Sequence, residues 1–422
     1  MLRPLLDRLR RLKHKLARSA IRRVQEIYDF LIGNQLRAKE QFNTVEHAIL
    51  LLPEFSHLDP NLSYFVMHAS FGDKWCILSY LASHFDIYPS SRVIAAKADL
   101  PIIEAFFEEQ MVINRFIFVD SNALNKLSAY FRPTRRSTSQ LADHYFNGEC
   151  GLAIAPYFVK HGLPAGTIRH LHLVQYPYFG DLYMLRAVTY GTLLKTLLYL
   201  PNSVKPNQPT YYTDADLQSA HDISSVQNLP TTGEDLLPAV LFNVVNFSHA
   251  SLSLDQINLI VAILESSGYR TLLNVAQHPQ QADIEAIVGS HPNAVVVAIP
   301  PKLLAIVGDH VASVIGVLGG AMNVAVQFGH SHVLSLQTPG IRFGCSEDEL
   351  YAGKGKENMW QWVNEDWPCL YPGRIVENRY IGDPSIIQNE ELVAVITAFL
   401  ERTKVSFYKP NASITSKGVV RW

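Results

Sequence analysis

Two glycine-containing turns carry the residue types that could bind an anion and move a proton. The first, SFGD at residues 70–73, follows an apolar strand-like run at 64–67, and the second, LGGAMN at 318–323, follows another at 312–317. A strand, a glycine turn and a helix N-terminus form an anion site, because unpaired backbone N–H groups and the helix dipole point at one spot. Two such turns predict two nucleotide-type α/β halves that face one cleft.

The first turn also offers side chains for chemistry. Gly72 allows the backbone to approach a ligand closely, and Ser70 offers a hydroxyl. Asp73 stands at the start of the expected helix, where a carboxylate is a favourable cap. The same carboxylate, held at the mouth of a cleft, could accept a proton from a substrate hydroxyl. Both interpretations fit the residues.

The second turn lacks the full GxGxxG spacing and matches no Walker pattern. It is either a tight strand-to-helix turn or a diphosphate site at the carboxyl end of a parallel strand. In the second case the contacts would come from Gly319, Gly320, Ala321, Met322 and Asn323.

A third strand-to-helix connection lies between the strand expected at 239–245 and the helix expected from residue 254; we call it the third corner. Ser248 and His249 could line the same phosphate site, whereas Ser253 with Gln256 three residues on also fits an ordinary capping box. Lys302 stands at the next corner, where it could contact the donor or lie in solvent.

Composition favours a protein of two α/β domains without a transmembrane span. The chain has 422 residues, 48% of them hydrophobic, and no run of eighteen apolar residues. The four cysteines form no CxxC pair, which favours reduced thiols in the cytoplasm. The pairs His170/His172 and His330/His332 have no third ligand nearby in sequence, so we expect structural roles, no metal site and no cofactor.

The N-terminal segment is basic and amphipathic. Residues 3–23 hold nine Lys or Arg and one acidic residue, and leucines recur at spacings of three or four. This pattern predicts a helix on an anionic membrane surface. A helix that packs on protein is the alternative, and nucleic acid is not expected because no aromatic-interleaved basic patch follows.

Strand and helix patterns alternate twice along the chain, which predicts mostly parallel sheets. In the first half we expect strands at 64–68, 92–96, 114–119, 151–155 and 169–174, with helices at 74–85, 100–109 and 182–200. In the second half we expect strands at 239–245, 270–275, 294–298, 312–317 and 332–336, with helices at 254–267, 281–288, 301–307, 321–328 and 389–402. The predicted domains are a helical extension (1–60), an acceptor domain (61–201), a linker (202–238), a donor domain (239–400) and a tail (401–422).

Three stretches resemble one enzyme family. YFVMHASFGDKWCILSYLASHF, VLFNVVNFSHASLSLDQINLIVAILESSGYRTLLN and ASVIGVLGGAMNVAVQFGHSHVLSL resemble segments of the ADP-heptose:lipopolysaccharide heptosyltransferases, which are glycosyltransferases of the GT-B type. The resemblance covers about residues 62–400. It implies two Rossmann-like domains facing a cleft and metal-independent, inverting transfer from a nucleotide sugar. Asp73 matches the position of the catalytic base, and the two glycine turns match phosphate-binding segments.

The sequence departs from this family at the second turn and at the third corner. Gly319 and Asn323 stand where the family usually has an acidic or hydroxyl residue and a histidine, and residues 248–253 lack the expected lysine. We therefore expect a distant branch that uses another nucleotide sugar and a cell-surface glycan or lipid-linked acceptor. The expected location is the cytoplasm, with peripheral contact to the inner face of the membrane. The alternatives are a catalytically silent GT-B-like scaffold subunit and a nucleotide-sugar epimerase.

Overall fold

We describe the architecture from a computed structural model of the chain. The structure describes residues 43–130, 159–160, 162–171, 190–201, 203–225, 237–244, 252–275, 280–317, 319–329, 331–337, 374–381, 387–404, 413–414 and 420–421. The basic segment at 3–23 and the strand expected at 151–155 lie outside these ranges, as do Ser248 and His249.

The N-terminal half contains a five-stranded sheet in the order β1-β5-β2-β3-β4, in which only β1 is antiparallel. Its strands are β1 Asn43–Thr44, β2 Ser63–Val66, β3 Ser91–Ala96, β4 Phe116–Val119 and β5 Thr167–His170. Its described helices are α2 Val45–Leu51, α3 Phe71–Ile87, α4 Leu100–Ile103, α5 Glu109–Arg115, α6 Ser121–Tyr130 and α10 Tyr190–Leu197, with short 3-10 helices η1 Pro53–Phe55 and η2 Lys97–Asp99.

The C-terminal half contains a six-stranded, fully parallel sheet in the order β11-β10-β9-β6-β7-β8. Its strands are β6 Ala239–Asn243, β7 Arg270–Asn274, β8 Ala294–Val297, β9 Ser313–Val317, β10 His332–Gln337 and β11 Val376–Tyr380. Its described helices are α12 Leu254–Ser266, α13 Gln281–Val288, η4 Pro301–Leu303, α14 Leu304–Asp309, α15 Gly320–Phe328 and α18 Asn389–Lys404. A short pair, β12 Ser413–Ile414 and β13 Val420–Arg421, follows in the chain.

Both sheets are Rossmann-like, which confirms the predicted fold class. Numbered within its own half, the C-terminal sheet has the strand order 3-2-1-4-5-6, and the four parallel strands of the N-terminal sheet have the order 3-2-1-4. The order reverses between β6 and β9 in one sheet and between β2 and β5 in the other. The glycine turn at 70–73 follows β2 and the one at 319–323 follows β9, so each lies at a switch point, where open α/β sheets bind ligands.

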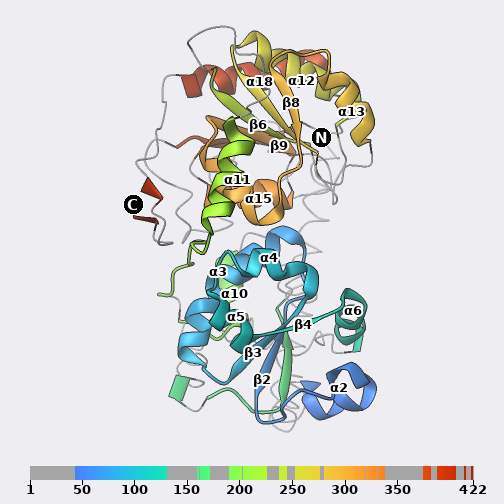
Figure 1. The fold of residues 1–422 in the computed structure, drawn as a ribbon, viewed down its shortest axis with the longest axis vertical. Helices are drawn as coiled ribbons and strands as arrows, with labels where there is room; N and C mark the ends of the chain where they lie inside the picture. The colour runs from blue at the N-terminus through green and yellow to red at the C-terminus, as the bar shows by residue number, and fades with distance from the viewer. Residues whose placement is uncertain are drawn as a thin grey trace, which may run out of the picture.

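The two halves stack along the long axis of the molecule, and α15 of one half faces α3 and α4 of the other (Figure 1). One buried hydrophobic cluster runs through both halves and includes Trp75, Phe106 and Phe328. The outer face of the C-terminal sheet has its own core under α12 and α18, and the outer face of the N-terminal sheet has another under α2 and α6. The shared cluster makes the domain junction part of the core.

The structure differs from the expected elements in several places. Residues 43–58, expected in a separate helical extension, supply β1 and part of the core of the N-terminal sheet. The helix expected at 100–109 is two helices, α4 and α5, which are separated by a turn at 104–108 that buries Phe106 and Phe107. The segment expected as a linker contains α11 Asp214–Ser225, whose polar sequence gave little helical signal. The parallel edge strand β11 was not predicted because VENRY shows no apolar alternation.

Candidate functional site

Helix α3 begins in the first glycine turn with Ser70 as its N-cap residue. Ser70 has extended backbone angles, but its side chain does not cap the helix. Its hydroxyl donates instead to Oδ2 of Asp73 over 2.6 Å. The carboxylate of Asp73 therefore stands in the first turn of α3, half-buried and held by the exposed Ser70.

Helix α15 begins in the second glycine turn with Gly319 as its N-cap residue. Gly319 has no side chain and cannot cap the helix, and the N–H of Asn323 bonds the Gly319 carbonyl over 2.9 Å. Met322 in the first turn is fully buried and contacts the strand at Gly316, where an added Cβ would lie 2.8 Å from the Met322 sulfur. The strand glycine thus lets the start of α15 lie close to the sheet.

The two glycine turns touch each other across the two halves. A Cβ added to Gly72 would lie 2.9 Å from Cα of Gly320, and a Cβ added to Gly320 would lie 2.9 Å from the backbone N of Gly72. Only glycine at both positions permits this approach. We call this contact, with the side chain of Asn323 that flanks it, the glycine joint.

Behind the glycine joint, α3 and α15 pack together and run in the same direction. The thiol of Cys76 donates to Oε1 of Gln327 over 3.1 Å, and the rings of Trp75 and Phe328 have centroids 5.4 Å apart. Contacts near the start of one helix thus pair with the start of the other, and later residues pair with later residues. The positive ends of two helix dipoles consequently lie side by side, and neither has a side-chain cap.

Lys74, which directly follows the first turn, and Lys302, at the corner before α14, are each paired with a carboxylate. Nζ of Lys74 lies 2.6 Å from Asp99, and Nζ of Lys302 lies 2.7 Å from Asp216 of α11. Burial alone would raise the pKa of Asp216, but bonds from Lys302 and Thr213 lower it. Lys302 is therefore mostly buried in an ion pair rather than in solvent, and it attaches α11 to the C-terminal half; its contact with the donor stays a prediction.

The third corner can be described only where it enters α12. Ser253 and Gln256 form the capping box that the sequence predicted, with bonds of 3.3 Å and 2.8 Å. Ser248 and His249 remain predictions, since they lie outside the described residues.

Sequence reasoning missed the residues that join the two halves. Cys76 and Gln327 lie 251 positions apart, and neither has a local pattern that announces a partner. Burial raises the pKa of the Cys76 thiol well above its ordinary value, and the nearby Asp73 carboxylate adds to this rise. The one feature of the sequence that could have indicated this junction was the presence of a glycine in each of two turns that were predicted to face the same cleft.

Asn243 and Asn274 are a second missed pair, at the carboxyl ends of β6 and β7. The Asn274 amide donates to Oδ1 of Asn243 over 2.8 Å and accepts from the N–H of Ile299 over 3.2 Å. Both asparagines are buried and fix three neighbouring strand ends beneath the second turn. Their role in this structure is to hold the corners of the site.

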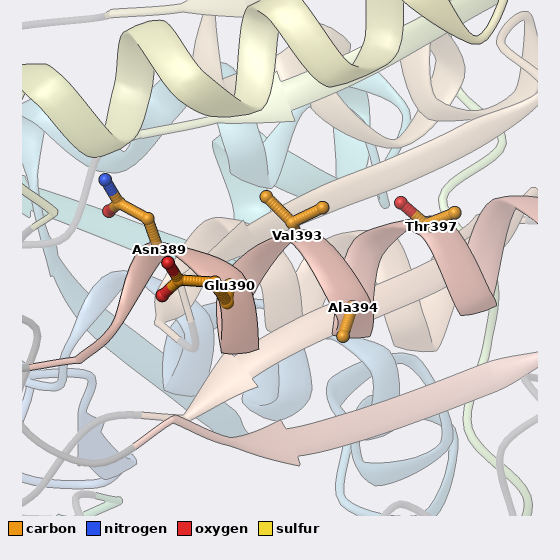
Figure 2. A pocket seen from close by; sticks show the side chains of 5 residues that line it. All are labelled: Asn389, Glu390, Val393, Ala394 and Thr397. Carbon is orange, nitrogen blue, oxygen red and sulfur yellow. The ribbon is translucent and has the colours of Figure 1, made fainter.

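A separate open groove of about 450 Å³ lies along α18 (Figure 2). Its lining comes from one stretch of that helix: Asn389, Glu390, Val393, Ala394 and Thr397. Helix α18 packs on the face of the sheet opposite to α15, so this groove is not part of the glycine joint.

Of the four histidines singled out from the sequence, His170 and His332 are described, and His172 and His330 lie outside the described residues. The ring Nδ1 of His332 accepts a bond from the N–H of Ile375 over 3.0 Å, and His170 is buried in β5. In the ranges described above, no three His, Cys, Asp or Glu side chains gather as metal ligands. Nor does any helix within those ranges have the length and apolar character needed to cross a membrane.

Comparison with known proteins gives distant structural similarities. The ADP-heptose lps heptosyltransferase II of E. coli is 11% identical over 81% of this chain and 99% of its own, with a TM-score of 0.47. A glycosyl transferase family 9 protein from Veillonella parvula is 13% identical over 82% and 98%, with a TM-score of 0.46. A UDP-GlcNAc 2-epimerase from Neisseria meningitidis, bound to UDP-GlcNAc, is 10% identical over 85% and 97%, with a TM-score of 0.42.

No protein-family model and no curated protein matches the sequence. The similar solved structures named above comprise glycosyltransferases and an epimerase.

Proposed function

We propose that this chain is an inverting, metal-independent glycosyltransferase that moves a sugar from a nucleotide diphosphate donor to a hydroxyl of a cell-surface glycan or lipid-linked acceptor. The glycine joint carries the proposal. It sets two uncapped helix N-termini side by side at the switch points of two Rossmann-like sheets, with the carboxylate of Asp73 in the first turn of one of them.

The diphosphate would lie against the start of α15, close to the start of α3. Backbone N–H groups and two helix dipoles favour negative charge there, and this preference grows as the leaving diphosphate gains charge in the transition state. The proposed contacts are Gly319, Gly320, Ala321, Met322 and Asn323 from one turn and Gly72 from the other. Fixed dipoles of this kind need no metal ion to stabilise the leaving group.

Asp73 would act as the general base. It takes the proton of the acceptor hydroxyl, and the oxygen forms a bond to the anomeric carbon from the face opposite the diphosphate. The bond from the anomeric carbon to the diphosphate oxygen breaks, and its electron pair leaves with the nucleoside diphosphate. A single displacement inverts the anomeric configuration. The hydrogen bond from Ser70 to Oδ2 supports this role because it orients the carboxylate.

The basic segment at 3–23 would hold the enzyme on the inner face of an anionic membrane, where a lipid-linked acceptor is present. Its charge and leucine spacing support this part of the proposal. The proposed location is the cytoplasm with peripheral membrane contact.

A thermal-shift screen with ADP, GDP, UDP, CDP and dTDP in EDTA tests the proposal. At a concentration of 100 times the dissociation constant, one of these ligands should stabilise the folded protein by about 2.7 kcal/mol. The corresponding nucleosides, which lack phosphate, serve as controls and should give a much smaller shift. A protein that none of the five diphosphates stabilises would not be this kind of transferase.

A further inference from the structure

We propose that Gly72 and Gly320 are positioning residues, which fix the distance between Asp73 of one half and the diphosphate-binding turn of the other. On this view the two halves stay in contact at the glycine joint throughout turnover. The inference depends on the proposed function, because it concerns the same site.

The contact involves main-chain atoms that cannot rotate away. The atoms nearest to the added Cβ are Cα of Gly320 in one direction and the backbone N of Gly72 in the other, both at 2.9 Å. One extra carbon at either position therefore has to push the starts of α3 and α15 apart. Asp73 follows Gly72 directly, so the carboxylate moves with α3.

An aromatic cluster holds the helices together directly behind the glycines. The ring of Trp75 lies 5.3 Å from Phe106 and 5.4 Å from Phe328, and Phe106 and Phe328 are 5.7 Å apart, measured between centroids. Trp75 is fully buried, and the two phenylalanines are 4% exposed. Opening the joint would bring all three rings into water.

A polar contact within the same interface also opposes opening. The Cys76 thiol lies 3.1 Å from the Gln327 amide oxygen and equally far from the carbonyl of Gly72 on its own helix, and Gln327 is only 2% exposed. Separation of the helices would remove the contact with Gln327, whereas the contact within α3 would stay.

The segment at 203–225, which connects the two halves, crosses the junction and has contacts with each half. The N–H of Asn207 bonds the carbonyl of Ser79, and the N–H of Thr210 bonds that of Ala105, so the segment lies along the N-terminal half. A few residues later Asp216 pairs with Lys302 of the C-terminal half. The segment thus restrains the halves rather than separating them.

A reversible covalent lock tests whether the joint opens. Gln327→Cys introduces a second thiol on the side of α15 that faces Cys76, and mass spectrometry after mild oxidation shows whether a disulfide has formed. The oxidised protein should keep its nucleoside diphosphate affinity and its turnover within about twofold, and reduction with dithiothreitol should change little. Gln327→Cys combined with Cys76→Ala, which cannot form the bond, is the control. A tenfold or greater loss that dithiothreitol reverses would overturn the proposal.

Single-carbon additions test the positioning role without any cross-link. Gly72→Ala and Gly320→Ala should lower kcat by on the order of a hundredfold, since small misplacements of reacting groups have effects of this size. Gly308→Ala in α14 is the matched control, because nothing lies within 4 Å of its added Cβ. Leu264→Ala, in the outer core, controls for lost stability: it should lower Tm but keep kcat at temperatures where it is folded.

The two proposals fail in different ways. A wild-type protein that binds no nucleoside diphosphate contradicts the proposed function. An active wild type in which both glycine variants keep full kcat contradicts only the positioning role of the glycines.

Discussion

Nδ1 of His84, near the end of α3, lies 2.9 Å from the carbonyl oxygen of Leu198, which follows α10. A carbonyl only accepts, so Nδ1 carries the proton. Nε2 is buried and has no hydrogen-bond partner among the described residues. Burial lowers the pKa of His84 to about 4, against the smaller opposing effect of the Leu198 bond. His84 is thus a neutral imidazole packed edge-on against Phe65, with centroids 4.7 Å apart.

This pKa predicts a loss of stability in mild acid. The unfolded state takes up a proton near pH 6.5 and the folded state only near pH 4, so the contribution of His84 is complete above pH 6.5 and falls as the pH drops toward 4. Between pH 7 and pH 5 it should lower the free energy of unfolding by about 2 kcal/mol. Urea unfolding of wild type and of His84→Asn, which keeps a donor but does not titrate, measures the difference. Equal losses in both proteins would show that His84 does not titrate on unfolding.

Asp73→Asn separates the role of a base from a structural role. The Asn side chain has nearly the same shape and its amide oxygen can still accept the hydrogen bond from Ser70, so the variant should fold and bind a nucleoside diphosphate as the wild type does. Because an amide cannot take the proton, turnover should fall about a hundredfold or more. Steady-state kinetics with a soluble acceptor, beside calorimetry with the diphosphate, gives both values. Turnover near that of the wild type would leave Asp73 with only a structural role.

The start of α15 can be tested with a charge and its neutral isostere. Ala321→Asp places a carboxylate in the first turn, where it suits the helix dipole but competes with a bound anion. Nucleoside diphosphate affinity should fall about tenfold or more, because nearby like charges in a partly buried site repel strongly. Ala321→Asn has nearly the same shape and should bind within about twofold of wild type. Calorimetry that finds the same affinity in both variants would exclude this helix end as the anion site.

Gly320→Val would test the anion site less cleanly than the two Ala321 variants. Its Cβ would meet the Gly72 backbone at 2.9 Å and Phe71 at 3.1 Å, so the packing of the two halves would change together with any ligand contact.

The C-terminal end of α15 is bound by the guanidinium of Arg374, and we expect this contact to stabilise the protein. The guanidinium donates to the carbonyls of Ala325, Val326 and Ser331 over 2.7, 2.8 and 2.6 Å. The first two belong to the last turns of the helix, where a positive charge is favourable. Arg374→Ala should lower the free energy of unfolding by about 3 kcal/mol, since charged hydrogen bonds are lost from buried carbonyls. Arg374→Lys keeps the charge but not the planar fork, so its stability should lie between those of the wild type and the Ala variant. Thermal unfolding measures all three proteins, and an Ala variant as stable as the wild type would contradict this role.

The basic N-terminal segment gives a prediction that depends on the sequence alone. Deletion of residues 2–23 should abolish co-sedimentation with vesicles that contain anionic lipid and leave turnover of a soluble acceptor intact. Binding of the full-length protein should weaken as salt rises. If the full-length protein does not sediment with such vesicles even at low salt, the segment contacts protein instead.

Most of the fold follows from local patterns in the sequence. Apolar runs of four to six residues bounded by glycine, serine or proline marked β2, β3, β6, β7 and β9 within about two residues, because a buried parallel strand is apolar throughout. The same reasoning found α12 from its capping residues. It could not find α11, whose polar sequence is helical largely because Ala220 and its neighbours pack on the C-terminal half.

The site was predictable as two separate turns but not as one assembly. A glycine in a strand-to-helix turn, such as Gly72 or Gly320, indicates that another group approaches its backbone closely. The sequence does not show that each of these two glycines approaches the other. Lys302 shows the same limit, because only the arrangement of α11 reveals Asp216 as its partner. Long-range pairing is decided by packing, which local patterns do not encode.

The shared core across the junction also has a consequence for synthesis of the chain. Cys76 leaves the ribosome 251 residues before Gln327, so Trp75 and Phe106 lack their partner Phe328 while the rest is translated. At rates of about 5–20 residues per second this interval is roughly 10–50 s. During that time the nascent N-terminal half presents an aromatic surface that resembles an exposed core. A chaperone that binds apolar segments would find its target there, and release would follow once α15 covers it.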